Sequence, residues 1–329
     1  MWFFYAHLLV DILERFSYTD SVKKHIPNGS YLKVSLEVRS VYMRRNMIHK
    51  DDVLEAIKKP MKQYYEEMTT VLGNWQPLER AAEKLLEGKE ASDDEVQDAY
   101  LPLLKMMRLI AKVTKESEWD WSNPVIQEIF KDKADSPLYK IFTNAMVGTV
   151  SSILKKVKVG TLVEVGTGPG QVTKSMCEEM VKSNITIPII ISDRAPGITQ
   201  TRENLLQAFP SLTINAFIWN IKEKPPKELV DSLAKPVLVF ERFSLPYAGH
   251  DAIDMISPIA DILIMQDDLS LTGKKMAFDV LYGKIGTQFL TFREARKRLE
   301  KHFSFIHTCD RDITEAINSS VTTFTLAIK

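Results

Sequence analysis

Near the middle of the chain, an acidic residue precedes three glycines that stand at every second position. The segment LVEVGTGPGQVTKSM (162–176) places Glu164, Gly166, Gly168 and Gly170 between an apolar run and a helical pattern. Glycine permits positive φ and lets a ligand lie against the backbone, which a side chain would prevent. A dinucleotide fingerprint requires Gly-x-Gly-x-x-Gly, and here the third glycine comes one residue early. A carboxylate beside the turn disfavours a diphosphate and suits a cationic or amine-bearing ligand.

The elements that must position this turn are short apolar runs, which are typical of strands covered on both faces. From Gly160 onward the candidate strands are 161–165, 187–192, 212–218, 236–241, 260–265, 303–308 and 321–328. Helical or loop stretches separate the first five, and the last two lie closer together, which permits an antiparallel return at the sheet edge. We expect an α/β fold with a Rossmann-like, seven-stranded, mostly parallel sheet, in which the glycine turn lies at the carboxyl end of the first strand, where ligands bind.

Residues 1–150 read instead as an all-helical domain, and residues 151–329 as the α/β domain. Apolar residues at three- and four-residue steps predict helices over 51–72, 93–117 and 134–156. We expect Pro60 to bend or divide the first of these, and Asp135 or Ser136 to start the last, just before Pro137.

The helical half also contains a polar stretch and an apolar opening. The polar stretch 86–95 predicts a surface turn. Charged residues at positions 11, 14 and 15 interrupt the apolar opening, MWFFYAHLLVDILERF, before it reaches the length of a membrane span. It is interpreted as a buried first helix, with a membrane-surface anchor as the alternative.

Composition excludes several classes of function. Lys and Arg together number 43, as do Asp and Glu, so no overall field attracts nucleic acid or an anionic membrane. One short basic and aromatic cluster, 41–50, fits the solvated face of a helix. The cysteines are Cys177 and Cys309, which lack the spacing of a zinc site or a disulfide scaffold. We therefore expect a reducing, cytoplasmic setting.

Residues 162–170 resemble the first motif of class I S-adenosylmethionine-dependent methyltransferases, an acid followed by Gly-x-Gly-x-Gly. The predicted strand order over residues 150–329 is also that of this family. SPLYKIF, followed by a long helix that leads into the first strand, is similar to the entry into methyltransferase domains of polyketide synthases. The resemblance implies that S-adenosyl-L-methionine is the cofactor, held at the turn by Glu164, Gly166, Thr167, Gly168 and Gly170.

The resemblance also implies cofactor contacts after the later strands. Asp193 would accept both ribose hydroxyls, since two O–H donors suit a carboxylate, with Arg194 beside it; a helix cap is the alternative for Asp193. Asn220 would accept from the adenine amino group, and Trp219 would either pack on the ring or belong to the core. Glu241, at the end of the fourth strand, completes the implied cofactor contacts.

Candidate catalytic residues follow the fourth and fifth strands. His250 is the first candidate for a base, because its ordinary pKa suits proton removal near neutral pH, and Glu241 is the second. With His250, the run Gln266, Asp267 and Asp268 could hold a divalent ion, but a solvated acidic strand end is favoured. The sequence lacks the Asn/Asp-Pro-Pro-aromatic tetrad after the fourth strand, which argues against methylation of a nucleobase amine.

The leading hypothesis is a methyltransferase that acts on a small molecule or an acyl-carrier-linked substrate, at oxygen or carbon. The alternative is a non-catalytic methyltransferase-like module whose helical half engages a partner. The helical half is expected to form a lid or a homodimer surface, and the sequence leaves both open. Tyr139, Phe142 and Met146 either line the roof of the pocket or pack their helix on the sheet.

Overall fold

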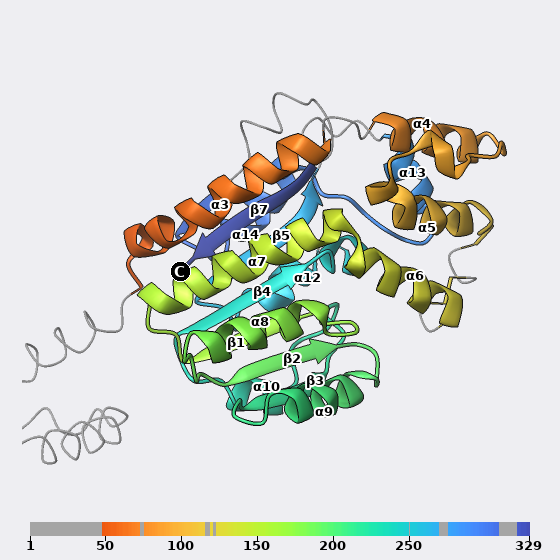
Figure 1. The fold of residues 1–329 in the computed structure, drawn as a ribbon. Helices are drawn as coiled ribbons and strands as arrows, with labels where there is room; N and C mark the ends of the chain where they lie inside the picture. The colour runs from red at the N-terminus through yellow and green to blue at the C-terminus, as the bar shows by residue number, and fades with distance from the viewer. Residues whose placement is uncertain are drawn as a thin grey trace, which may run out of the picture. The chain divides into compact units, whose positions relative to one another are not determined.

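The computed structural model describes residues 48–72, 76–115, 119–120, 123–249, 251–269, 276–308 and 321–329. Ile48–Lys329 forms one compact unit. The predicted first helix, at the apolar opening of the chain, lies outside the described residues. Element labels are those of Figure 1.

In the described residues, seven strands form one mixed sheet with the order β3-β2-β1-β4-β5-β7-β6. The strands are β1 (Thr161–Val165), β2 (Ile189–Asp193), β3 (Ile214–Ile218), β4 (Val237–Arg242), β5 (Ile262–Leu269), β6 (Phe305–Thr308) and β7 (Val321–Ile328). The first five pair in parallel, and β7 pairs antiparallel with both β5 and β6. This confirms the predicted Rossmann-like sheet and its antiparallel return: β7 lies between β5 and the edge strand β6.

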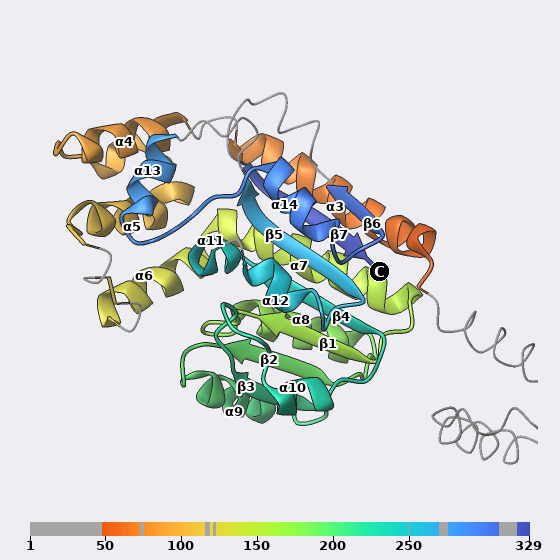
Figure 2. The same ribbon diagram turned by 180° about the vertical axis from the view of Figure 1, so that it is seen from behind.

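Helices cover both faces of the sheet. One face carries α3 (Lys50–Leu72), α7 (Pro137–Lys156), α8 (Gln171–Lys182) and α9 (Ile198–Ala208), as Figure 1 shows. Leu162, Phe240 and Ile264 point toward this face and belong to its core. The other face, seen in Figure 2, carries α10 (Lys227–Asp231), α11 (Leu245–Ala248), α12 (Ala252–Ile256) and α14 (Phe292–Leu299). Since both faces are covered, the parallel strands can meet a ligand only at an end of the sheet.

The longest of these helices runs through a proline. α3 is one continuous helix from Lys50 to Leu72 with Pro60 inside it, so Pro60 does not divide the helix, and a bend at Pro60 stays a prediction. A Cβ at Gly148 of α7 would lie 3.2 Å from the Pro60 Cβ. The two helices therefore approach closely at the proline, and this packing offsets the backbone hydrogen bond that proline cannot donate.

The start of α7 agrees with the sequence prediction. Ser136 is its N-cap, and the Ser136 side chain accepts a hydrogen bond from the Tyr139 N–H at 3.4 Å, with Pro137 in the first turn. Because α7 leads directly into β1, this cap fixes where the helix begins at the carboxyl end of the sheet.

The helix predicted over 93–117 is shorter than expected. Two short 3₁₀ turns, Asp93–Glu95 and Asp98–Tyr100, precede α5 (Leu101–Ala111). Pro102 explains the late start, because proline fits the first turn of a helix but not its interior. The predicted surface turn over 86–95 is confirmed, since exposed residues there separate the end of α4 from the first 3₁₀ turn.

Four further helices gather beyond the carboxyl ends of the parallel strands (Figure 1). They are α4 (Gln76–Leu86), α5, α6 (Pro124–Asp135) and α13 (Ala277–Gly283). The Glu79 carboxylate on α4 accepts from the N–H groups of Ala277 at 2.5 Å and Phe278 at 3.1 Å, which caps α13. Residues far apart in the sequence thus build one helical cluster, which we call the edge cluster.

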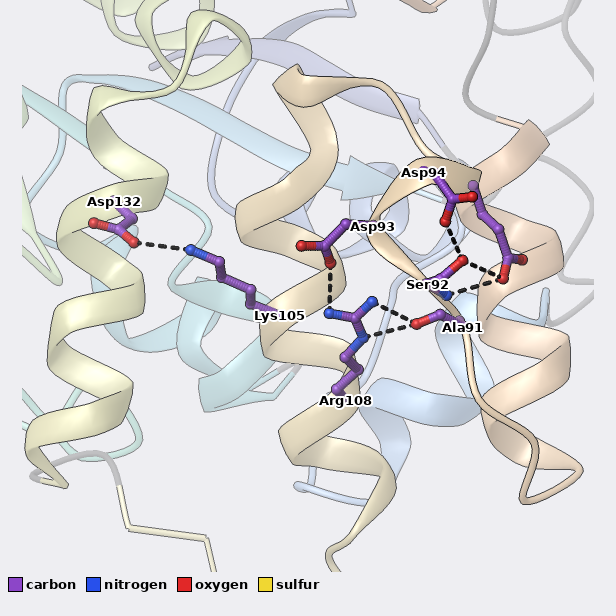
Figure 3. Close-up of polar contacts among 8 residues, drawn as sticks. Ala91, Ser92, Asp93, Asp94, Lys105, Arg108 and Asp132 are labelled. Carbon is purple, nitrogen blue, oxygen red and sulfur yellow. Dashed lines mark hydrogen bonds and ion pairs between the residues drawn. The ribbon is translucent and has the colours of Figure 1, made fainter.

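Polar contacts join the parts of the edge cluster, as Figure 3 shows. The Arg108 guanidinium on α5 donates to the carbonyl oxygen of Ala91 at 2.8 Å and pairs with Asp93 at 2.6 Å. Lys105 on the same helix pairs with Asp132 of α6 at 3.4 Å. These contacts hold α5 against the segment after α4 and against α6.

The predicted domain boundary near residue 150 falls inside α7, and α3 packs against α7 on the sheet. The division into domains 1–150 and 151–329 stays a prediction. Among the described helices, none combines the length and apolar character that crossing a membrane requires.

Candidate functional site

The glycine turn between β1 and α8 has the backbone that its sequence predicts. The φ angles are +68° at Gly166, +55° at Gly168 and +83° at Gly170. Residues with a Cβ rarely adopt these conformations, so glycine is needed at all three positions. Gly170 is also the N-cap of α8, so the turn ends where the helix begins.

Side chains occupy the space beside two of the three glycines. A Cβ at Gly166 would lie 2.0 Å from the Ser244 Oγ, and a Cβ at Gly170 would lie 2.6 Å from the Thr201 Cγ2. A Cβ at Gly168 would have no atom within 4 Å. Side chains from the loop after β4 and from α9 therefore pack against Gly166 and Gly170, and the cofactor contacts predicted for the three glycines stay predictions. Gly168 alone leaves open space.

The Asp193 carboxylate lies against this turn from the end of β2. Its Oδ2 accepts from the Gly168 N–H at 2.9 Å, and its Oδ1 accepts from the Ala195 N–H at 2.9 Å. A carboxylate oxygen can accept two hydrogen bonds, so each oxygen retains capacity for a ligand hydroxyl. The N-cap of α9 is Gly197, so Asp193 does not act as the cap that was its alternative role.

Two neighbours of the turn complete its surroundings. Thr167 is buried, and its hydroxyl has no hydrogen-bond partner in the described part of the chain. Arg194, which follows Asp193, has an exposed side chain. The cofactor contacts predicted for both residues stay predictions.

At the end of β3, the structure separates the two residues that the sequence offered for the adenine. Trp219 is only 3% exposed, packs in the core on the α10 and α12 face, and donates from Nε1 to the carbonyl oxygen of Glu223 at 3.0 Å. Asn220 is half-buried, and its Oδ1 accepts from the Lys222 N–H at 3.2 Å. This placement agrees with the core alternative for Trp219, and Asn220 stays a predicted adenine contact.

Glu164 is buried on β1, on the face covered by α7 and α8. Its carboxylate accepts a hydrogen bond from the hydroxyl of Thr173 on α8. Burial raises the pKa of Glu164 to about 7, and the nearby Arg242 guanidinium partly opposes this rise. Glu164 is therefore enclosed between β1 and α8, and the cofactor contact predicted for it stays a prediction.

A pair of buried carboxyl groups lies on the opposite face, at the ends of β4 and β5. Glu241 is 0% exposed and Asp267 is 2% exposed, and each carboxyl group affects the protonation of the other. The Ser244 N–H also donates to Glu241 Oε2 at 3.2 Å. Burial raises the pKa of Glu241. Two close carboxyl groups without solvent cannot both ionise readily, so the pair holds a proton near neutral pH.

The other predicted residues of this region divide between the two faces. Asp267 and Gln266 are consecutive in β5 and point to opposite faces, and both are buried, so the favoured interpretation of a solvated strand end is wrong for them. His250 and the Asp268 side chain lie outside the described residues. Within the described residues, no group of three or more His, Cys, Asp and Glu side chains is placed to hold a metal ion.

Aromatic residues of α7 pack against the end of β4. The Tyr139 and Phe142 rings lie 5.9 Å and 5.4 Å from the Phe243 ring, and Met146 is fully buried. These contacts agree with the prediction that the three α7 residues pack their helix on the sheet.

Sequence reasoning missed three residues of this site, namely Thr173, Arg242 and Ser244. Arg242 could have been recognised from its place in VFERF, because a charge directly after an apolar run marks the strand end. Ser244 and Thr173 gave no such signal, because only the fold brings Ser244 to Gly166 and Thr173 to Glu164.

Comparison with solved structures gives several matches over most of the chain. The citrinin polyketide synthase CMeT domain matches with a TM-score of 0.64 at 11% identity, over 86% of this chain and 98% of that domain. The DszA carbon methyltransferase matches with a TM-score of 0.52 at 13% identity, over 70% of this chain and 66% of that one. The CurJ carbon methyltransferase matches with a TM-score of 0.51 at 14% identity, over 81% and 70%.

Sequence comparisons add nothing to these structural matches, since no family model and no curated protein matches the chain. The three solved structures show that the fold is that of class I S-adenosylmethionine-dependent methyltransferases, as the sequence resemblance predicts.

The packing at Gly166 predicts how two glycine substitutions differ. Gly168→Ala adds only the strain of positive φ, which costs about 1–2 kcal/mol. Gly166→Ala adds the same strain and also overlaps Ser244, which costs about 1–3 kcal/mol more. Urea unfolding measures both free energies, and in a double-mutant cycle Ser244→Gly should recover part of the Gly166→Ala loss. Equal losses for the two glycine variants would contradict the close approach of Ser244.

The raised pKa of Glu164 predicts a pH dependence of stability. The folded state binds the Glu164 proton more tightly than the unfolded state, so this contribution is fully present below about pH 4.5 and is lost as the pH rises through about 7. Glu164→Gln should make the fall in the free energy of unfolding between pH 5 and pH 8 shallower by up to about 3 kcal/mol. Urea unfolding at four pH values measures this, with Glu178→Gln on the exposed side of α8 as the control. Parallel pH profiles for wild type and Glu164→Gln would refute the assignment.

Proposed function

We propose that this chain is an S-adenosylmethionine-dependent methyltransferase that acts on a small molecule or a carrier-bound acyl substrate, at oxygen or carbon. The observation that carries this proposal is the Asp193 carboxylate, held against Gly168 by a hydrogen bond of 2.9 Å at the carboxyl ends of β1 and β2. This is the part of a parallel sheet where ligands bind. The fold shared with the three methyltransferase structures supports the same proposal.

The residues at this edge fit the cofactor. Gly168 leaves open space where any other residue would place a Cβ, so a nucleoside can lie against its backbone. Asp193 retains two acceptor positions for the ribose hydroxyls, and the buried Thr167 hydroxyl has unused hydrogen-bonding capacity among the described residues. Asn220 is the proposed partner of the adenine amino group. When bound, S-adenosyl-L-methionine would supply an electrophilic methyl group.

The Glu241 and Asp267 pair is the proposed site of proton removal from the acceptor. An oxygen or carbon acid must lose a proton as it is methylated, and a base with a pKa near neutral pH does this most efficiently. Burial gives Glu241 this property, and the neighbouring Asp267 is buried as well, which disfavours ionisation of both carboxyl groups. His250, predicted as the first candidate base, stays a prediction outside the described residues.

The edge cluster is the proposed lid. Its helices α4, α5, α6 and α13 lie beyond the carboxyl ends of the parallel strands (Figure 1), where exclusion of water would favour group transfer. Two of the similar structures are named as carbon methyltransferases, and a carbon acid is therefore the acceptor that we propose first for this chain. The homodimer through the helical half and the cytoplasmic setting stay predictions.

One observation favours the alternative of a non-catalytic module. Ser244 occupies the space beside Gly166, and the Asp193 carboxylate already accepts two backbone N–H groups. Both features close part of the turn. The alternative therefore predicts a methyltransferase fold that binds no nucleoside, and cofactor binding decides between the two.

Asp193→Asn should weaken the binding of S-adenosylhomocysteine by roughly 10- to 100-fold, because the ribose hydroxyls lose a charged acceptor. Titration calorimetry measures this, with Asp231→Asn on the exposed side of α10 as the matched control and thermal melting as the test of folding. Equal affinity for wild type and Asp193→Asn would remove Asp193 from the site. A wild-type protein that binds no nucleoside would favour the non-catalytic module.

Glu241→Gln should lower kcat for methyl transfer to acetoacetyl-N-acetylcysteamine, a thioester with an acidic carbon, by about 100-fold or more. The affinity for S-adenosylhomocysteine should change by less than about threefold, since the proposed role concerns the acceptor proton. Glu228→Gln on the exposed side of α10 is the control. A rate that survives Glu241→Gln would exclude Glu241 as the base.

A further inference from the structure

Three polar side chains lie side by side on the α7 face, at the carboxyl ends of adjacent strands. Glu164 of β1 is paired in register with Phe240 of β4, so Arg242 lies two residues further along the same face. Arg242 is paired in register with Gln266 of β5. An acid, a cation and an amide therefore follow one another across β1, β4 and β5. The methyltransferase chemistry proposed above assigns no role to Arg242 or Gln266.

The Arg242 guanidinium is held in place but has most of its donors unused. Its Nη1 donates to the Thr143 hydroxyl of α7 at 2.6 Å. Its Cζ lies 6.0 Å from the centroid of the Tyr139 ring and 5.9 Å from that of the Phe243 ring. A guanidinium carries five N–H donors, and within the described ranges Thr143 is the one hydrogen-bond partner of this group.

The neighbouring Gln266 is the stronger sign of a binding site. Its side chain is 0% exposed, and neither its amide nitrogen nor its amide oxygen has a hydrogen-bond partner among the described residues. An unpaired buried polar group destabilises the folded state, and most buried polar groups in proteins are paired. A ligand that reaches Arg242 would also reach the amide nitrogen of its register neighbour.

The local charge selects an anion. Burial lowers the pKa of Arg242 to about 10, so the guanidinium remains protonated at neutral pH. Glu164, its acidic neighbour, has a pKa raised to about 7 and is therefore only partly ionised there. The positive charge is incompletely balanced by the groups around it. A planar guanidinium with free donors can hold a carboxylate through two parallel hydrogen bonds.

We infer that Arg242 and Gln266 form a carboxylate-binding subsite, with Thr143 orienting the guanidinium. The carboxylate has two sources, the amino-acid end of the cofactor or the methyl acceptor. Both sources rest on the proposed methyltransferase function, whereas carboxylate binding itself can be tested without it. Arg242 lies on β4, the strand that pairs with β1, so the amino-acid end of a nucleoside bound at Gly168 would cross one strand to reach it.

Calorimetry with two nucleosides tests the first source. Arg242→Gln should weaken S-adenosylhomocysteine binding at least tenfold. The affinity for 5′-methylthioadenosine, which lacks the amino acid, should change by no more than about twofold. Arg293→Gln on the exposed side of α14 is the matched control. Gln266→Leu should also weaken the binding of S-adenosylhomocysteine. The same substitution should raise the Tm of the free protein by about 2 °C, because it removes an unpaired buried amide. A glutamine with a purely structural role would not produce this combination.

Acetate titration of the wild-type protein tests the subsite without a nucleoside and without dependence on the folding of a variant. The NMR signal of the Arg242 Nε–H group should shift as acetate is added. If S-adenosylhomocysteine blocks the shift and 5′-methylthioadenosine does not, the carboxylate of the cofactor occupies the subsite. If the shift persists with S-adenosylhomocysteine bound, the subsite serves the acceptor.

The outcomes separate the two proposals. If the wild-type protein binds neither nucleoside but shows the acetate shift, the proposed methyltransferase function is contradicted and the carboxylate subsite is supported. The carboxylate subsite is contradicted if the Arg242 signal does not shift with acetate and the Arg242→Gln variant keeps both nucleoside affinities or loses both equally.

Discussion

A parallel sheet that is covered by helices on both faces can present polar side chains to a ligand only at the ends of its strands. In this protein the constraint is strict, because α3, α7, α8 and α9 cover one face and α10, α11, α12 and α14 cover the other. Apolar side chains fill both layers, and the acids and the arginine gather at the carboxyl end. The location of the candidate site therefore follows from the way the sheet is buried.

Burial also sets the chemistry of that edge. Glu164, Glu241 and Asp267 are almost without solvent, and desolvation favours the protonated form of a carboxyl group. The pKa values of Glu164 and Glu241 are raised for this reason. Side chains along a strand point alternately to the two faces of the sheet. Glu164 therefore lies on the α7 face, and the Glu241 and Asp267 pair lies on the opposite face. One edge thus holds two separate proton sites.

The glycine turn shows how closely the strand-end loops are packed. Ser244, after β4, fills the space at Gly166, and Thr201 of α9 fills the space at Gly170. Glycine serves two purposes here: it lets neighbouring side chains pack against the turn at these two positions, and it leaves room for a ligand at Gly168. Asp193 links the turn to β2, so the open position and the carboxylate that would use it are held in one geometry.

The sequence by itself determined the sheet, the glycine turn and the place of Asp193 at the end of β2, because these depend on local patterns: apolar runs, positive φ at glycine and a charge at a strand end. It also determined the start of α7, where Ser136 precedes Pro137. Only the tertiary structure decided which groups meet. The contact of Ser244 with Gly166, the pairing of Glu241 with Asp267 and the placement of Gln266 beside Arg242 join segments distant in sequence. Strand register and burial fix these contacts, and neither is encoded in the spacing of neighbouring residues.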